Sequence, residues 1–157
     1  MKTLLVTGGA GFIGGNFVLD LLALGGYRIV NLDALTYAGN PDTLAEVSGD
    51  GNYRFALGDI GDRECVQALL AEHQPTGIVN FAAGSHVDRS IDGPADFVRT
   101  NVVGTLNLLE CALAYWRSLP LDRQDAFRFL HVSTDEVYGS LGPVGRFTEE
   151  SPYQPNS

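Results

Sequence analysis

Short apolar runs alternate along the chain with longer segments in which apolar residues recur every three or four positions. Runs of the first kind are typical of buried strands, and segments of the second kind are typical of amphipathic helices. The predicted strands are residues 3–6, 27–33, 52–59, 77–83 and 126–133. The predicted helices are residues 12–25, 63–73 and 97–116. This alternation predicts βαβ units, and therefore an α/β fold with a parallel sheet.

The alternating pattern stops at Gly139. The remaining sequence, "SLGPVGRFTEESPYQPNS", is rich in Gly, Pro and Ser and predicts an irregular loop. A chain of 157 residues with 45% hydrophobic residues has the size and composition of one globular domain. We therefore expect a single domain over residues 1–139 and a loop over residues 140–157.

The charge and the cysteines exclude several classes of partner. A net charge of −9 disfavours binding to nucleic acid or to an anionic membrane surface. No uninterrupted run of about 18 apolar residues predicts a membrane span, and the first residues have no export signal. Cys65 and Cys111 are too far apart for a metal knuckle, and each lies in a predicted helix. We expect buried free thiols, a cytoplasmic protein and no metal site.

The string "VTGGAGFIGG" places Gly8, Gly11 and Gly14 between the first predicted strand and the first predicted helix. Glycine permits a tight strand-to-helix turn and lets a pyrophosphate approach the backbone. The phosphates would bind the amide groups of Phe12 and Ile13 at the positive end of the helix. This context favours a dinucleotide site in a doubly wound, Rossmann-type domain over a purely structural glycine turn.

Asp33 closes the second predicted strand, about 20 residues after the glycine loop. A carboxylate there accepts hydrogen bonds from the adenosine ribose and repels a 2′-phosphate, so the sequence favours NAD over NADP. The alternative is that Asp33 only caps a turn or a helix.

Two acids, Asp135 and Glu136, follow the fifth predicted strand in the string "FLHVSTDEVYG". Ligands of parallel α/β sheets bind beyond the carboxyl ends of the strands, so this position favours a catalytic pair. The alternative is that the two acids merely end a strand and cap a turn.

Five strings occur in an order that resembles one protein family: "TGGAGFIG", "GDI", "NFAAGSHVDRS", "TNVVGTLNLLE" and "STDEVYG". The chain resembles the extended short-chain dehydrogenase/reductases, and most closely the dTDP-glucose 4,6-dehydratases among them. The Thr-Asp-Glu string carries this choice, because UDP-galactose 4-epimerases lack the acidic pair and GDP-mannose dehydratases typically have Thr-Ser-Glu. One departure is Gly84, where the family has Glu.

The resemblance implies a tightly bound NAD, a nucleotide-sugar substrate and a set of site residues. Cofactor contacts are implied for Gly8, Gly11, Phe12, Ile13, Gly14, Asp33, Ala34, Leu35, Thr36, Asp59, Ile60, Phe81, Ala82, Ala83, Ser85 and Thr100. Substrate contacts are implied for Ser85 and Thr134, and catalytic roles for Thr134, Asp135 and Glu136.

The implied reaction converts dTDP-glucose to dTDP-4-keto-6-deoxyglucose and water, in deoxysugar biosynthesis. Oxidation at carbon 4 acidifies the carbon-5 proton, which Glu136 would remove while Asp135 protonates the leaving hydroxyl. One carboxyl must therefore be neutral while the other is charged, which close carboxylates in a partly desolvated cleft achieve by splitting their titrations.

The family's hydride chemistry also needs a Tyr placed four residues before a Lys, and no such pair occurs in this sequence. We therefore expect an N-terminal portion with five strands, which lacks the last strands and the substrate domain and is inactive alone. The alternatives are a non-catalytic NAD-binding half-domain or partner subunit, and a related UDP-sugar dehydratase or epimerase. The resemblance also implies a homodimer built on the long helix after Thr100.

Several other residues receive a structural interpretation. We expect His131 to be a satisfied interior histidine, because it alternates with apolar neighbours in a strand. Tyr115 and Trp116 are expected in the core or an interface. Asn101 is a candidate for the structural Asn of the superfamily, bridging strands four and five through water. His86 and Arg89 face either a substrate phosphate or a structural ion pair with Asp88 or Asp92.

Overall fold

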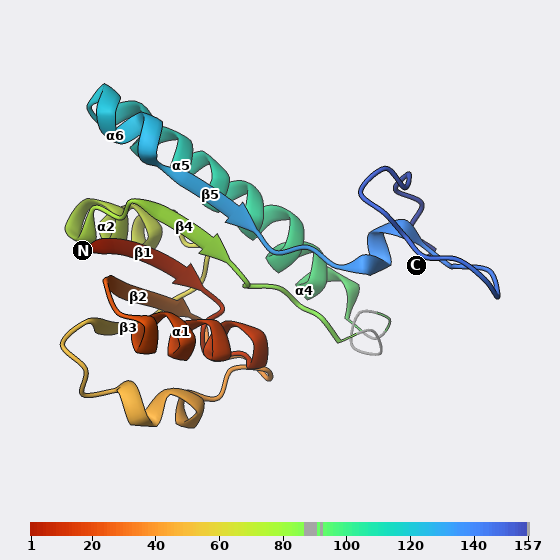
Figure 1. Cartoon of the computed structure of the whole chain (residues 1–157), viewed down its shortest axis with the longest axis horizontal. Helices are drawn as coiled ribbons and strands as arrows, with labels where there is room; N and C mark the ends of the chain where they lie inside the picture. Colours follow the sequence, from red (N-terminus) through yellow and green to blue (C-terminus); the bar gives the residue numbers. More distant parts are fainter. Residues whose placement is uncertain (87–90, 92, 157) are drawn as a thin grey trace.

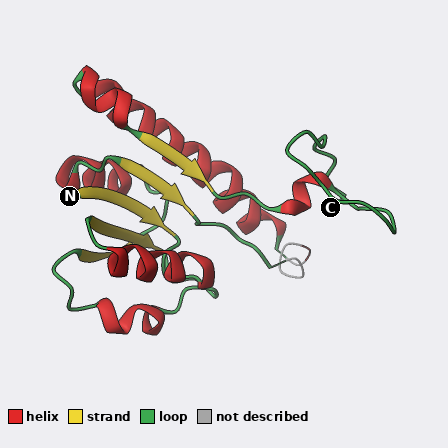
Figure 2. Ribbon diagram, in the orientation of Figure 1, coloured by secondary structure: helices red, strands yellow, loops and turns green. Residues whose placement is uncertain are grey.

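The computed structural model describes residues 1–86, 91 and 93–156. One five-stranded parallel sheet organises the chain, with the strand order β3-β2-β1-β4-β5 (Figures 1 and 2). The strands are β1 (Lys2–Thr7), β2 (Tyr27–Asp33), β3 (Tyr53–Leu57), β4 (Gly77–Asn80) and β5 (Arg128–His131). The predicted α/β fold and its five parallel strands are confirmed.

The helical segments include all three predicted helices and further short ones that periodicity does not predict. The predicted helices correspond to α1 (Phe12–Leu24), to α2 (Arg63–His73) and to a run of α4 (Pro94–Val98), η2 (Arg99–Gly104) and α5 (Thr105–Ser118). The additional segments are η1 (Pro41–Val47), α6 (Leu121–Ala126) and η3 (Asp135–Tyr138). The third predicted helix is thus interrupted by a π-helical turn at η2, a feature found frequently at functional sites.

The sheet is covered on both faces, so the strands are apolar on both sides. Val6 and Ile29 pack with Val18 of α1 and Leu44 of η1 in one cluster. The other face holds a larger cluster with α2 and α5, to which β1 contributes Leu5. Successive residues of a strand point to opposite faces, which is why neighbours in β1 belong to different clusters.

The strand order reverses at β1. The chain first runs outward through β2 and β3, then crosses back to add β4 and β5 on the other side. Thr7 pairs with Leu32 of β2 and with Asn80 of β4, and these are the last pairs of both ladders. Beyond them the glycine loop leaves the sheet, so β4 ends at Asn80 rather than at the predicted residue 83. Ligands of doubly wound sheets bind at such a switch point.

The interior placement predicted for His131 is wrong. Its side chain is exposed, because β5 is the last strand of the described sheet. The ring is nevertheless satisfied, since Nδ1 lies 2.9 Å from Nδ2 of the buried Asn80. The predicted fifth strand also begins too early, because residues 121–126 form α6, in which Arg123 donates to the backbone oxygen of Gln74.

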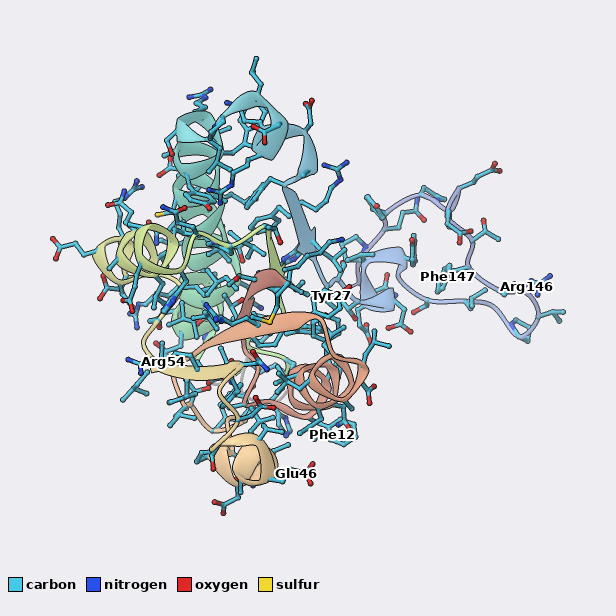
Figure 3. All side chains as sticks on the ribbon, turned by 60° about the vertical axis from the view of Figure 1, so that its left-hand side comes forward. Phe12, Tyr27, Glu46, Arg54, Arg146 and Phe147 are labelled. Atoms are coloured by element: carbon cyan, nitrogen blue, oxygen red, sulfur yellow. The ribbon has the colours of Figure 1, made fainter. Side chains whose placement is uncertain are left out.

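The segment after η3 contains neither helix nor strand over residues 140–156 and extends away from the sheet (Figure 1). It turns back on η3, because the amide of Gln154 donates to the carbonyl of Val137 at 2.9 Å. The ring of Tyr138 stacks on Phe147 with centroids 5.2 Å apart and contacts Tyr153. Figure 3 shows Phe147 and Arg146 on this projecting segment.

Candidate functional site

A cavity of about 630 Å³ lies at the carboxyl edge of the sheet, beyond β1, β2, β3 and β4. Its walls come from the glycine loop, from the loops after β2, β3 and β4, and from α4 with η2. The lining residues are Gly8, Gly11, Leu32, Asp33, Ala34, Thr36, Tyr37, Ala38, Gly39, Gly58, Asp59, Ile60, Phe81, Ala82, Ala83, Gly84, Gly93, Asp96, Phe97, Arg99 and Thr100.

Two glycines are required by the packing of the loop between β1 and α1. Gly8 has φ +72°, and a Cβ there would lie 2.5 Å from the amide nitrogen of Ala82. A Cβ on Gly14 would lie 2.3 Å from the carbonyl oxygen of Gly8. Because both neighbours are backbone atoms, neither position can accept a side chain without moving the loop.

The first turn of α1 is open to a ligand. Its N-cap is Gly11, which provides no side-chain hydrogen bond. A helix begins with amide groups that have no partner within the helix, and these groups attract anions. The side chains of Phe12 and Ile13 are 83% and 64% exposed, and Figure 3 shows Phe12 at the surface. The backbone here fits the phosphates of a dinucleotide.

Two buried side chains of β2 hold the glycine loop in place. Oδ1 of Asn31 accepts a hydrogen bond from the amide of Gly9 at 3.0 Å. Oδ2 of Asp33 accepts one from the amide of Ala10 at 2.8 Å. Asn31 also donates through Nδ2 to the hydroxyl of Tyr53 at 3.0 Å. Burial raises the pKa of the Tyr53 hydroxyl, which therefore stays neutral at physiological pH.

Asp33 caps a turn and lines the cavity, and its predicted contact with the adenosine ribose stays a prediction. Its Oδ1 accepts a hydrogen bond from the amide of Leu35 at 2.8 Å, so it does cap a turn. It also lines the cavity, where a carboxylate can accept further bonds. Leu35 has φ 49°, an unusual conformation for a residue with a side chain, and such strain is common at functional sites.

The loop after β4 is fixed by two asparagines. Oδ1 of the buried Asn80 accepts bonds from the hydroxyl of Thr7 and the amide of Ala82. Asn101 of η2 makes two bonds to the backbone of Gly84: Oδ1 accepts from its nitrogen at 2.7 Å, and Nδ2 donates to its oxygen at 2.9 Å. Asn101 thus contacts the β4 loop directly, and the predicted water bridge between strands four and five stays a prediction.

Gly84, the position where the family resemblance implies Glu, packs against an aromatic ring. A Cβ at this position would lie 3.0 Å from Cδ2 of Phe97, which also lines the cavity. Phe97 would therefore have to shift to admit a side chain at position 84. No feature of the sequence alone indicates this contact.

The loop after β2 reaches across to the loop after β4. The hydroxyl of Tyr37 accepts hydrogen bonds from the amides of Ser85 and His86, both at 3.2 Å. The rings of Tyr37 and His86 also meet edge to face, with centroids 6.1 Å apart. This contact was not predicted, because Tyr37 carries no motif signal.

The acidic pair lies on η3, directly after β5. Thr134 is the N-cap of this turn, and its Oγ1 accepts from the amide of Glu136 at 3.3 Å and lies 3.4 Å from Oδ1 of Asp135. Within the described ranges, these three residues are exposed and lie outside the lining of the cavity. The two acids are consecutive residues of one exposed turn, and the predicted desolvated cleft around them stays a prediction.

The structure brings together most of the predicted cofactor residues. Those that line the cavity are Gly8, Gly11, Asp33, Ala34, Thr36, Asp59, Ile60, Phe81, Ala82, Ala83 and Thr100. Those outside its lining are Phe12, Ile13, Gly14, Leu35 and Ser85. Tyr37 and Phe97 also line the cavity, although the sequence did not predict them as site residues. The alternatives for Arg89, Asp88 and Asp92 lie outside the described residues.

Both cysteines of the described part are free thiols. Burial raises the pKa of the Cys65 and Cys111 thiols, and neither cysteine forms a disulfide. Over residues 1–86, 91 and 93–156, no group of three or more His, Cys, Asp or Glu side chains could hold a metal ion. In the same residues, no helix has the length and apolar character to cross a membrane.

Comparisons with known proteins cover the whole fold. The model of the family described as GDP-mannose 4,6 dehydratase matches residues 5–157. A curated dTDP-glucose 4,6-dehydratase of Xanthomonas campestris pv. campestris (strain B100) is 65% identical over 157 residues, which are 100% of this chain and 44% of that protein. The chain thus spans less than half the length of the curated relative.

Two solved structures extend the comparison. A dTDP-glucose 4,6-dehydratase from Streptomyces venezuelae, solved with NAD and TYD bound, superposes with a TM-score of 0.85 at 48% identity, over 98% of this chain and 46% of that one. A UDP-glucose 4-epimerase from Thermus thermophilus, solved in complex with NAD, gives a TM-score of 0.82 at 32% identity, over 99% of this chain and 45% of that one.

Proposed function

Because the chain belongs to the GDP-mannose 4,6-dehydratase family, we propose that it is the cofactor-binding part of an NAD-dependent sugar-nucleotide 4,6-dehydratase. The proposed substrate is dTDP-glucose, and the products are dTDP-4-keto-6-deoxyglucose and water. One observation carries the proposal: a glycine-walled cavity and an acid pair both follow strands of the same parallel sheet. The relatives at higher identity are dehydratases, which favours this reaction over that of the epimerases.

The cavity offers groups for two parts of NAD, the pyrophosphate and the adenosine ribose. The open first turn of α1 would hold the pyrophosphate, and Gly8 and Gly14 let the loop before it pack closely against neighbouring backbone. The carboxylate of Asp33 would accept hydrogen bonds from the ribose hydroxyls and repel a 2′-phosphate. When bound, NAD would supply the hydride acceptor for carbon 4 of the sugar and, once water has left, the hydride donor for carbon 6.

The acids would carry out the elimination. Glu136 removes the proton from carbon 5, and Asp135 delivers a proton to the oxygen on carbon 6, so that one water leaves. The hydroxyl of Thr134 lies 3.4 Å from Oδ1 of Asp135 and accepts a hydrogen bond from the backbone amide of Glu136, so it contacts both acidic residues. For one residue to act as base and the other as acid, the carboxyl group of Glu136 must be charged while that of Asp135 is neutral.

Residues 1–157 alone should bind NAD without turning over dTDP-glucose. The 4-hydroxyl must lose a proton for hydride transfer, and this sequence has no Tyr placed four residues before a Lys to accept it. Isothermal titration should detect NAD binding, with NADP bound more weakly. Failure to bind either nucleotide would refute the cofactor site.

The elimination is tested in a chain that also carries the Tyr-Lys pair. In deuterated water, the wild type should place deuterium at carbon 5 of the product. Glu136→Gln should abolish this exchange while the oxidation at carbon 4 remains detectable. Full deuterium incorporation by Glu136→Gln would remove Glu136 from the role of base.

A non-catalytic NAD-binding half-domain is the second candidate function, because the cavity requires only the described strands and loops. The intact mass of the protein from its native source separates the two. A mass near twice 16.8 kDa supports the dehydratase, and a mass of 16.8 kDa supports the half-domain.

A homodimer is proposed on the long helix after α4. An apolar stripe on α4, η2 and α5 repeats every three or four residues and consists of Val98, Val102, Leu106, Leu109, Leu113 and Trp116, each between 36% and 60% exposed. A contiguous apolar surface of this kind marks an interaction site. Leu106→Lys should lower the sedimentation mass, whereas the control Leu121→Lys on α6 should not.

The two free thiols further support a reducing, cytoplasmic setting.

A further inference from the structure

We infer that Tyr37 is a positioning residue, which fixes the loop after β4 against the loop after β2 and so sets the width of the cavity. Its hydroxyl accepts from two consecutive amides, those of Ser85 and His86, both at 3.2 Å. A hydroxyl oxygen has two lone pairs, so one group can accept both bonds. The expected effect of Tyr37 on NAD affinity rests on the proposed NAD site.

The loop that carries Tyr37 is held at both ends. Asp33 accepts from the amide of Leu35 at its start, and the amide of Gly39 donates to the carbonyl of Thr36 at 3.0 Å. The amide of Asn40 then donates to the carbonyl of Ala10 in the glycine loop at 2.9 Å. Tyr37 therefore projects from a turn that cannot shift independently of the glycine loop.

The loop that receives Tyr37 is anchored on its other side. Asn101 of η2 binds both backbone groups of Gly84, one residue before Ser85. Tyr37 and Asn101 thus hold neighbouring residues of one loop from two different elements. Gly84 and Tyr37 both line the cavity, so the connection joins two of its walls.

This arrangement orders the site before a ligand enters. Ser85 is predicted to contact both cofactor and sugar, and its backbone position depends on the hydroxyl of Tyr37. A site that is already ordered loses less conformational freedom on binding, which strengthens affinity. Tyr37, in the loop after β2, would thereby also position Ser85, which is predicted to contact the sugar.

The test compares Tyr37→Phe with wild type and with Tyr27→Phe. Both substitutions remove one hydroxyl, but Tyr27 lies at the amino end of β2, away from the cavity lining. Hydrogen exchange followed by NMR reports on the amides of Ser85 and His86, and calorimetry reports NAD affinity. Because two hydrogen bonds are lost in Tyr37→Phe, the amides of Ser85 and His86 should exchange about tenfold faster. The affinity for NAD should fall by about tenfold. Tyr27→Phe should leave both unchanged, and the melting temperatures should remain similar.

Unchanged exchange at Ser85 and His86 in Tyr37→Phe would overturn the inference. Faster exchange with unaltered NAD affinity would overturn its consequence for binding. If wild type itself bound no NAD, the proposed function would fail, while the exchange rates would still decide whether Tyr37 positions the loop.

Discussion

Replacing Asn31 by Leu should destabilise the glycine loop between β1 and α1. Asn31 is 0% exposed, and its side chain joins the amide of Gly9 to the hydroxyl of Tyr53. Leu has a similar volume but can form neither hydrogen bond. The substitution therefore isolates the polar contacts from the packing.

The expected cost follows from the groups left without a partner. The amide of Gly9 loses its partner in the interior, which costs about 1–3 kcal/mol. The hydroxyl of Tyr53 is only half-buried and can regain a bond to water. A loss of about 2 kcal/mol in the free energy of unfolding lowers the melting temperature of a domain of this size by about 4–8 °C.

Calorimetry of unfolding measures this loss, and a titration measures the parallel fall in NAD affinity. Asn16→Leu is the matched control, because Asn16 is exposed and should change the melting temperature by less than about 2 °C. Tyr53→Phe in both backgrounds completes a double-mutant cycle, in which the two changes should be non-additive. If Asn31→Leu unfolded at the melting temperature of the wild type, the stabilising role of the Asn31 hydrogen bonds would be refuted.

Three further outcomes are expected. Gly14→Ala should lower NAD affinity by roughly tenfold or more, because the new Cβ meets backbone atoms, whereas Gly51→Ala, with open space around it, should not; equal affinities would contradict the packing argument. Asp33→Asn should raise NADP affinity relative to NAD, since the repelling charge is gone, and a titration with both nucleotides that gives an unchanged ratio would count against that role. Iodoacetamide at pH 8 should alkylate Cys65 more slowly than free cysteine, as followed by mass spectrometry, because burial raises the thiol pKa and lowers the thiolate fraction; alkylation at the free rate would contradict this.

Periodicity located each strand of the described sheet because each lies within an apolar run of the sequence, and it located the three main helices because they are long enough for a period to develop. It missed η1, α6 and η3, which are too short for a period to develop. The exposed His131 was misplaced for a different reason. A strand in the middle of a sheet and a strand at its edge can have the same sequence pattern, and only the strand order separates them.

The sequence by itself determined the α/β fold, the parallel sheet and the place of the glycine loop, since these depend on local spacing and on where side chains are absent. It also determined that Asp135 and Glu136 follow a strand. Only the tertiary structure decided that Asn31 holds Gly9, that Asn101 holds Gly84, and that Tyr37 reaches Ser85 across the cavity. These contacts join residues far apart in the chain, and no local pattern encodes which loops the closing of the sheet brings together.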